Sequence, residues 1–155
     1  MIEVEIESPD WTAALGDAEA LARQAAEAAL GGAGREGDVV VLLTNDDSIA
    51  GLNQGFRGKA GPTNVLSFPA PESARPHLGD VAVAYGVASQ EASEQDKPLA
   101  HHLLHLVAHG VLHLVGYDHE GDSEAEAMEA LERRVLAGLG APDPYAPRAG
   151  AEDDL

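Results

Sequence analysis

Two hydrophobic patterns alternate along the chain, and each predicts a different kind of element. Residues 2–6 alternate between isoleucine or valine and glutamate, which is the two-residue period of a half-buried strand. Residues 38–44 form a continuous apolar run and predict a central strand covered on both faces. Shorter runs predict two further strands over residues 65–68 and 78–85.

Apolar residues at helical spacing mark the segments between and after these strands. An alanine-rich stretch predicts a first helix that ends at Gly31 and Gly32. A side chain among residues 45–47 can cap a short second helix that reaches Gly55. Three more helices are predicted over residues 87–95, 98–115 and 123–139, the last opened by a capping-box pattern at Ser123 and Glu126.

The order of these elements predicts the fold class. The first strands lie too close together in the sequence for every connection to be a full βαβ unit. We therefore predict an α+β fold, a single domain with a small mixed sheet of about four strands flanked by about five helices. The domain is expected to cover residues 1–141, and residues 142–155 are expected to form a flexible acidic tail.

The composition narrows the chemistry. With 155 residues, of which 45% are hydrophobic, the chain can bury one proper core. The absence of cysteine excludes disulfides and thiolate ligands, so any metal must rest on His, Asp or Glu. No leader-like start or long apolar run is present, so we expect a cytoplasmic protein without membrane contact. The net charge of −18 argues against indiscriminate binding of nucleic acid, although a local cationic cluster can still hold a phosphodiester.

Six of the seven histidines lie between positions 101 and 119, in a pattern that predicts a metal site. In the motif HGVLHLVGYDH, His109 and His113 are four residues apart, so their imidazoles project from one face of the expected helix. Gly116 lets the chain turn sharply, and His119 can return as a third ligand. Three imidazoles leave one coordination position open, so this H-x3-H-x5-H pattern predicts one catalytic zinc ion per chain.

Neighbouring residues are candidates for the surroundings of that ion. His105, one helical turn before His109, suits either the cleft wall or an orienting role behind a ligand, and an ordinary packed role is equally compatible. Asp118 could orient a ligand imidazole or serve as a turn residue. The remaining histidines are interpreted as surface residues: His77, His101 and His102.

The same histidine spacing occurs in the metzincin zinc proteases, but a catalytic group of those enzymes is missing here. Their general base is a glutamate directly after the first histidine, and this chain has Gly110 at that position. Glu120 or Asp118 would have to replace it, which makes a zinc peptidase the weaker alternative.

A basic loop offers a partner for a phosphate. Arg57 and Lys59 stand among Gly55, Gly58 and Gly61, so the exposed backbone could approach a phosphate while the arginine holds two of its oxygens. A solvated turn that happens to be basic is an equally good interpretation of this segment alone.

Three segments together resemble a known family. HGVLHLVGYDH, FRGKAGPTNVLSFP over residues 56–69 and LGD over 78–80 closely resemble the YbeY family of bacterial endoribonucleases, and the likeness runs from the first strand to the DPY at 143–145. The resemblance implies a small mixed sheet around a metal cleft. It implies His109, His113 and His119 as ligands and Arg57 as the catalytic arginine.

The resemblance also implies a biological role. Members are single-strand-specific endoribonucleases that mature the 3′ end of 16S rRNA and act in ribosome quality control. Small-subunit ribosomal proteins and an assembly GTPase are the implied partners. Lys59 would anchor a flanking phosphate, and three further residues are cleft candidates on the resemblance alone: Asn64, Ser67 and Asp80.

Several questions stay open at this stage. The nucleophile in RNA cleavage could be a zinc-activated water or the neighbouring ribose 2′-hydroxyl. Besides the zinc peptidase, a non-catalytic ribosome-assembly factor with a structural zinc remains an alternative function.

Overall fold

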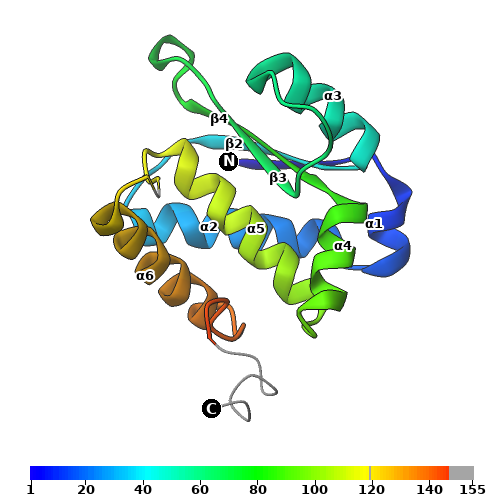
Figure 1. Ribbon diagram of the computed structural model, residues 1–155. Coiled ribbons are helices and arrows are strands. Elements are labelled where there is room, and N and C mark those ends of the chain that lie inside the picture. The colour runs from blue at the N-terminus through cyan, green and yellow to red at the C-terminus, as the bar shows by residue number, and fades with distance from the viewer. Residues whose placement is uncertain (119, 147–155) are drawn as a thin grey trace.

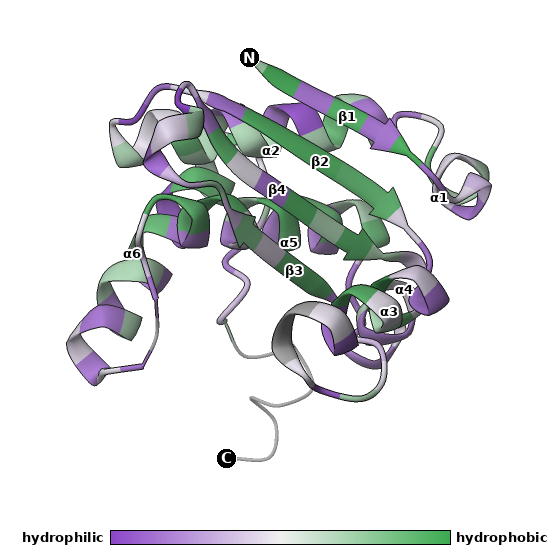
Figure 2. Ribbon diagram, turned by 90° about the horizontal axis from the view of Figure 1, so that it is seen from above, coloured by the Kyte–Doolittle hydropathy of each residue, from purple (hydrophilic) through white to green (hydrophobic). Residues whose placement is uncertain are grey.

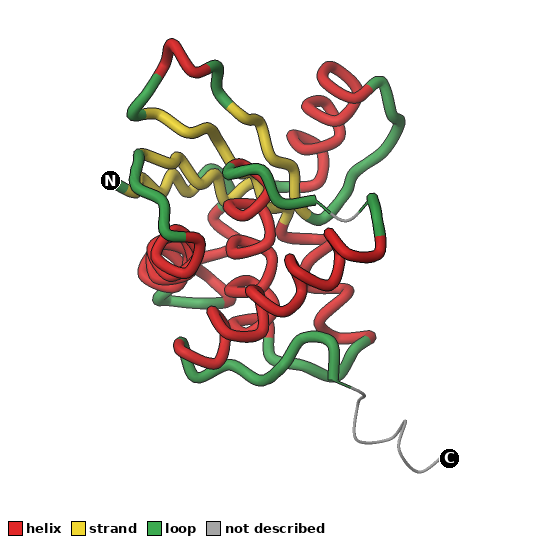
Figure 3. Tube along the Cα trace, turned by 90° about the vertical axis from the view of Figure 1, so that its left-hand side faces the viewer, coloured by secondary structure: helices red, strands yellow, loops and turns green. Residues whose placement is uncertain are grey.

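The structure, a computed structural model, describes residues 1–118 and 120–146, apart from the side chains of residues 56 and 57. The α-helix α3 (Asp46–Arg57) covers one face of a β-sheet, and the long helices lie against the other face (Figure 1). Viewed from the side, most helices gather below the strands while α3 stands apart from them (Figure 3). No helix in the described ranges has both the length and the apolar character that crossing a bilayer requires.

Four strands among the described residues form one mixed sheet, as predicted. They span Ile2–Ile6 (β1), Asp38–Thr44 (β2), Val65–Pro69 (β3) and His77–Ala84 (β4). Their order is β1-β2-β4-β3 (Figure 2). The first three strands in this order run parallel, and β3 runs antiparallel to β4. As a result β3 is an edge strand, with β4 as its neighbour.

The described ranges contain six α-helices, against about five expected. A short helix before the alanine-rich one accounts for the difference, and Pro9 suits its first turn because proline lacks the N–H that would stay unpaired there. The other helices follow the predicted positions closely. Besides α3, the helices are α1 (Pro9–Ala14), α2 (Ala18–Ala33), α4 (Tyr85–Glu94), α5 (Leu99–Leu114) and α6 (Asp122–Gly138), with a 3₁₀ turn at Glu72–Ala74.

The glycine stop and the capping box predicted for two helices differ from the structure. The expected stop at Gly31 and Gly32 is wrong, because α2 continues to Ala33 and ends at Gly34, whose φ of 67° is left-handed. At Gly32 a β-carbon would lie 2.9 Å from a methyl group of Val135, so this glycine serves the close packing of α2 on α6. The predicted capping box is also absent, since α6 begins after Gly121 without a side-chain cap.

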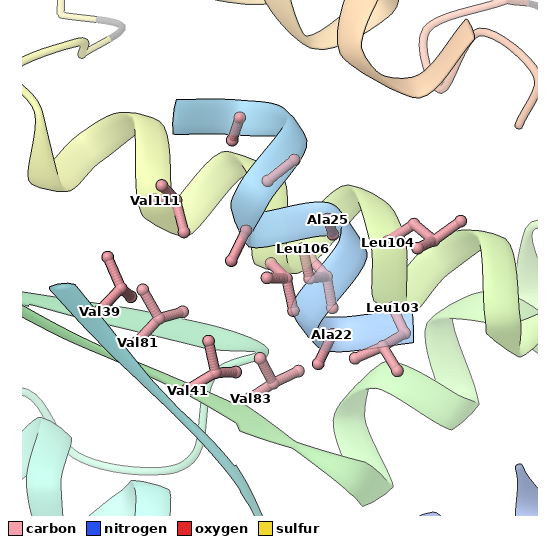
Figure 4. Close-up of a cluster of buried hydrophobic side chains, with 14 of the residues drawn as sticks. Ala22, Ala25, Val39, Val41, Val81, Val83, Leu103, Leu104, Leu106 and Val111 are labelled. Carbon is pink, nitrogen blue, oxygen red and sulfur yellow. The ribbon is translucent and has the colours of Figure 1, made fainter. Parts of the chain in front are cut away.

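The main core fixes α5 to the sheet. Valines of β2 and β4 point toward alanines of α2 and leucines of α5 (Figure 4). The small alanines allow α2 to lie close beside α5, so both helices can cover the same face. The labelled members are Ala22, Ala25, Val39, Val41, Val81, Val83, Leu103, Leu104, Leu106 and Val111. The histidines of α5 are therefore carried by a buried, closely packed helix.

The chain after α6 returns to the body of the protein. Residues 142–146, which open the predicted tail, are described, and Asp143 lies 3.2 Å from the guanidinium of Arg133 in α6. The aromatic ring of Tyr145 lies beneath the same guanidinium, 5.3 Å from its carbon to the ring centroid. The remainder of the predicted tail lies outside the described residues.

Candidate metal centre

His105, His109 and His113 line up along one face of α5, as their four-residue spacing predicts. The rings of His109 and His113 are 4.6 Å apart between centroids, and their Nε2 atoms are 3.1 Å apart. Two imidazole nitrogens that converge this closely are arranged as two ligands of a single cation would be. The third predicted ligand, His119, lies outside the described residues.

A buried carboxylate stands behind His109. Glu132 of α6 is 0% exposed, and its Oε1 lies 2.6 Å from Nδ1 of His109. Its Oε2 accepts a hydrogen bond from the hydroxyl of Tyr145, and Nε2 of His105 lies 3.5 Å from Oε1. Burial alone would raise the pKa of Glu132, but the hydrogen bonds from His105, His109 and Tyr145 outweigh it and lower the pKa to about 2. The carboxylate is therefore charged at neutral pH.

Tyr145 complements this charge. Burial, followed by its hydrogen bond to Glu132, raises the pKa of the tyrosine hydroxyl, which therefore remains a donor. His105 lies beside it, with Nε2 at 3.4 Å from the hydroxyl oxygen and the two rings edge to face at 5.5 Å. Nε2 of His105 thus lies within 3.5 Å of both the tyrosine hydroxyl and the carboxylate.

The described residues contain one group of histidine and carboxylate side chains that could hold a metal ion, formed by His105, His109 and Glu132. It shares His109 with the predicted ligand set. Glu132 approaches Nδ1 of that ring, whereas His113 approaches Nε2. Neutral imidazoles with a carboxylate suit zinc and similar divalent ions, so the donor chemistry fits a metal centre here.

A cleft of about 420 Å³ opens between the edge strand β3 and α5. One wall is the strand, and the other carries the two converging imidazoles, so a molecule in this cleft would contact both. Its described lining consists of Asn64, Val65, Leu66, Ser67, Pro69, His109 and His113.

Gly110 explains how α5 approaches the sheet so closely. Ser67 Oγ donates a hydrogen bond of 2.8 Å to the carbonyl of Gly110, which joins β3 to the helix. A β-carbon at this position would lie 2.6 Å from Cγ1 of Val81, inside the core. Position 110 is therefore packed against the sheet and has no room for a glutamate side chain.

Asn64 joins the cleft to a second histidine–carboxylate pair. Its side-chain amide lies 3.1 Å from Glu91, and its Oδ1 accepts the backbone N–H of Val65. Glu91 also lies 2.9 Å from Nε2 of His102. The expectation that His102 is a surface residue is wrong, because its side chain is 4% exposed where α5 packs on α4. Burial lowers the pKa of His102, and the hydrogen bond to Glu91 offsets only part of the shift.

The basic segment begins later than expected. Arg57 is the last residue of α3, which ends at Gly58 with a left-handed φ of 65°, and the arginine's side chain lies outside the described part. Lys59 is exposed in the loop that follows.

Two further candidates lie away from the cleft lining. Asp80 is on β4, where it pairs with His77 at 3.1 Å. It shares a sheet face with Ala82, which packs under α3, because side chains alternate along a strand. Asp118 accepts a hydrogen bond from the backbone N–H of Glu120, as a turn residue does.

Glu132 and Tyr145 are the site residues that sequence reasoning missed. The signal for Glu132 was present, because Met128 and Leu136 stand four residues to either side of it on the apolar face of the last helix. A charged residue inside an apolar stripe needs a partner. In the structure the partners of Glu132 include His105 and His109 of α5.

Fold and cleft together define a small α+β protein with an imidazole-lined, metal-competent cleft beside a sheet edge. The sequence profile of the family "Endoribonuclease YbeY" matches residues 4–140. The chain therefore belongs to the YbeY endoribonuclease family, which confirms the resemblance seen in the sequence.

Individual relatives agree with this assignment. A protein named Endoribonuclease YbeY from Rhodopseudomonas palustris (strain BisA53) is 49% identical, with 98% of this chain and 94% of the relative aligned. One of the same name from Maricaulis maris (strain MCS10) is 60% identical across 70% of this chain and 68% of its own length. A solution structure of a Thermotoga maritima protein shares 28% identity, with a TM-score of 0.56 over 94% of this chain and 99% of that one.

Proposed function

We propose that this protein is a zinc-dependent endoribonuclease that cuts single-stranded RNA. The observation that carries the proposal is the convergence of His109 and His113, with Nε2 atoms 3.1 Å apart, on the wall of a cleft beside β3. Membership of an endoribonuclease family supplies the class of substrate.

We assign the ion to Nε2 of His109, Nε2 of His113 and His119. The 2.6 Å separation between Nδ1 of His109 and Glu132 is that of a hydrogen bond, so Nδ1 carries the proton and Nε2 keeps its lone pair for the cation. Gly116, with a φ of 102°, supplies the turn after α5 that the third ligand requires. When bound, zinc supplies Lewis-acid chemistry at a phosphate oxygen or a water.

The residues around the cleft would hold the RNA strand. We assign Arg57 to the charge that develops on the phosphate under attack and Lys59 to a flanking phosphate. Asn64 and Ser67 line the cleft and can contact the nucleotide beside the scissile bond. Asp80 faces away from this lining and has no part in the proposal.

The finer role rests on the family resemblance. It comprises maturation of the 16S rRNA 3′ end and ribosome quality control in the cytoplasm, with small-subunit ribosomal proteins and an assembly GTPase as partners. With a net charge of −18, the protein has little long-range attraction for RNA. A ribosomal partner that presents the strand would overcome this.

The proposal is tested by offering the zinc-loaded full chain a single-stranded RNA, its duplex and an unstructured polypeptide. We expect cleavage of the single strand alone, and loss of cleavage on chelation. Arg57→Ala should lower the rate by about 10²–10³-fold at unchanged zinc content, the typical effect of removing one donor to a developing oxyanion. Arg75→Gln, which removes an exposed cation from the β3–β4 connection, is the matched control.

Other results would support a different function. Cleavage of the polypeptide would favour the peptidase, which the closed position of Gly110 disfavours. A zinc-loaded, folded protein that leaves RNA intact, with and without small-subunit proteins, would favour the non-catalytic assembly factor.

A further inference from the structure

We propose that Glu132 and Tyr145 are positioning residues of the metal centre: together they hold the imidazole of His109 in the tautomer and orientation that direct Nε2 toward His113. The inference deepens the function proposed above, because it takes His109 as a ligand through Nε2. It concerns two residues on α6 and the turn after it, neither of which is itself part of the cleft lining.

The burial of Glu132 is difficult to explain by stability alone. A carboxylate with 0% exposure has lost its hydration, and an apolar side chain in the same place would stabilise a helix interface at least as well. The neighbours of Glu132 on the same helix face, Met128 and Leu136, are apolar and equally buried. A buried charge is therefore exceptional on this face of α6. The contacts of Glu132 should show which function the charge serves.

Those contacts lead to one ring. Tyr145 donates to one oxygen of Glu132 and His109 approaches the other, so both carboxylate oxygens act as acceptors and the 2.6 Å bond has the Nδ1–H of His109 as its donor. A histidine that donates from Nδ1 presents an unprotonated Nε2, and that atom lies 3.1 Å from Nε2 of His113. The carboxylate thus sets which nitrogen of His109 is available and where it points.

Tyr145 restrains the carboxylate in turn. Its hydroxyl donates to Oε2, the oxygen that His109 does not use, so the two bonds together fix the rotation of the carboxylate. The tyrosine is itself held, since its backbone N–H donates 2.8 Å to Asp143 and its ring lies beneath Arg133. A turn outside the cleft lining is by this route connected to a proposed metal ligand.

Metal affinity tests this chain of contacts without any RNA. The metal-free protein is titrated with Co²⁺ and with Zn²⁺ in competition with a chelator, and the visible spectrum of the Co²⁺ form is recorded. Glu132→Met removes the acceptor at similar volume, and we expect affinity to fall by about 10–100-fold, the usual range for a lost orienting partner. Glu132→Gln keeps an acceptor without the charge and should retain part of the affinity.

Tyr145→Phe is the second variant, because it removes one hydroxyl and leaves a ring that still packs. We expect affinity to fall by less than about tenfold, below the range of a direct orienting partner, together with a shifted Co²⁺ spectrum. Matched controls are Glu126→Gln on the exposed side of α6 and Tyr85→Phe, whose ring packs edge to face on Trp11. Both should bind as wild type does.

Each outcome has a separate meaning. If Glu132→Met and Tyr145→Phe fold and bind Co²⁺ with wild-type affinity and spectrum, the positioning role is wrong, whatever the protein does to RNA. If Glu132→Met abolishes binding while His113→Ala retains it, Glu132 is itself a ligand, and the inference is overturned in favour of the His105–His109–Glu132 group. A wild-type protein that binds neither ion would contradict the proposed function first.

Discussion

Two histidines of α5 each pair with a carboxylate from another helix, and the two pairs differ in which partner is buried. In the first, His102 is 4% exposed and its partner Glu91 is 30% exposed. In the second, His109 is 20% exposed and its partner Glu132 is fully buried. The imidazole of His102 is packed in the protein interior. In the other pair the carboxylate of Glu132 is the buried partner, and the imidazole of His109 is open to the cleft. Which partner is buried therefore distinguishes a histidine that packs from one that can bind.

The comparison predicts that His109→Ala has the largest effect on stability. Removing the imidazole takes from the buried charge of Glu132 its hydrogen bond to His109, and breaking such a pair typically costs about 3–5 kcal/mol. Urea unfolding of the metal-free protein measures the change. The double variant His109→Ala/Glu132→Gln, which also removes the charge, should recover part of the loss. No recovery would mean that the charge of Glu132 is not the cause.

A second prediction concerns the surface on which both pairs depend, the contact of α5 with the sheet. Gly110→Ala places a methyl group 2.6 Å from Cγ1 of Val81. Overpacking of this kind costs about 1–3 kcal/mol. Gly51→Ala is the matched control, because no atom lies within 4 Å of its new β-carbon in α3. Alanine is the better helix former, so the control should gain up to about 1 kcal/mol. Equal effects at both positions would contradict the close packing of α5.

The pH dependence of the free energy of unfolding tests the burial of His102 in the first pair. Burial lowers the pKa of His102, while the unfolded chain has the ordinary value near 6.5. As the pH falls below about 6.5 the unfolded state therefore takes up its proton first, and the associated stability is lost toward the lower, folded pKa. In chelator, wild type should lose more stability between pH 7.5 and 5.5 than His102→Gln. His77→Gln, outside α5, is the control, and parallel curves for His102→Gln and wild type would contradict the assignment.

The smallest effect is expected at the edge of the second pair. Arg133 and Asp143 form an exposed ion pair at 3.2 Å, and pairs of this kind contribute about 0.2–1 kcal/mol. Asp143→Asn should therefore lower the free energy of unfolding by less than about 1 kcal/mol. A much larger loss in urea titration would show that the turn around Tyr145 stabilises the whole fold and does more than hold one side chain.

The elements that sequence reasoning found are those set by local periodicity. The apolar run of β2 and the four-residue spacing of His109 and His113 both lie within one element, so the pattern determines them directly. The convergence of the two Nε2 atoms follows from helix geometry for the same reason.

What the sequence could not show depends on contacts between elements. Glu132 meets His109 only because α6 packs on α5, and no spacing within either helix contains that contact. The prediction of a helix stop at Gly32 is wrong because the residue that this glycine accommodates, Val135, lies on another helix. The prediction of His102 as a surface residue is wrong because α4, which covers it, cannot be positioned from sequence.

The path from Tyr145 through Glu132 to His109 also has a consequence for synthesis. During translation α5 leaves the ribosome before α6. Its imidazoles therefore emerge before Glu132 and Tyr145, the residues that support His109. Those groups follow only with α6 and the turn after it. A nascent chain that ends shortly after α5 therefore lacks the groups that orient His109 for metal binding. The metal centre can form in its final geometry only when nearly the whole described fold has been synthesised.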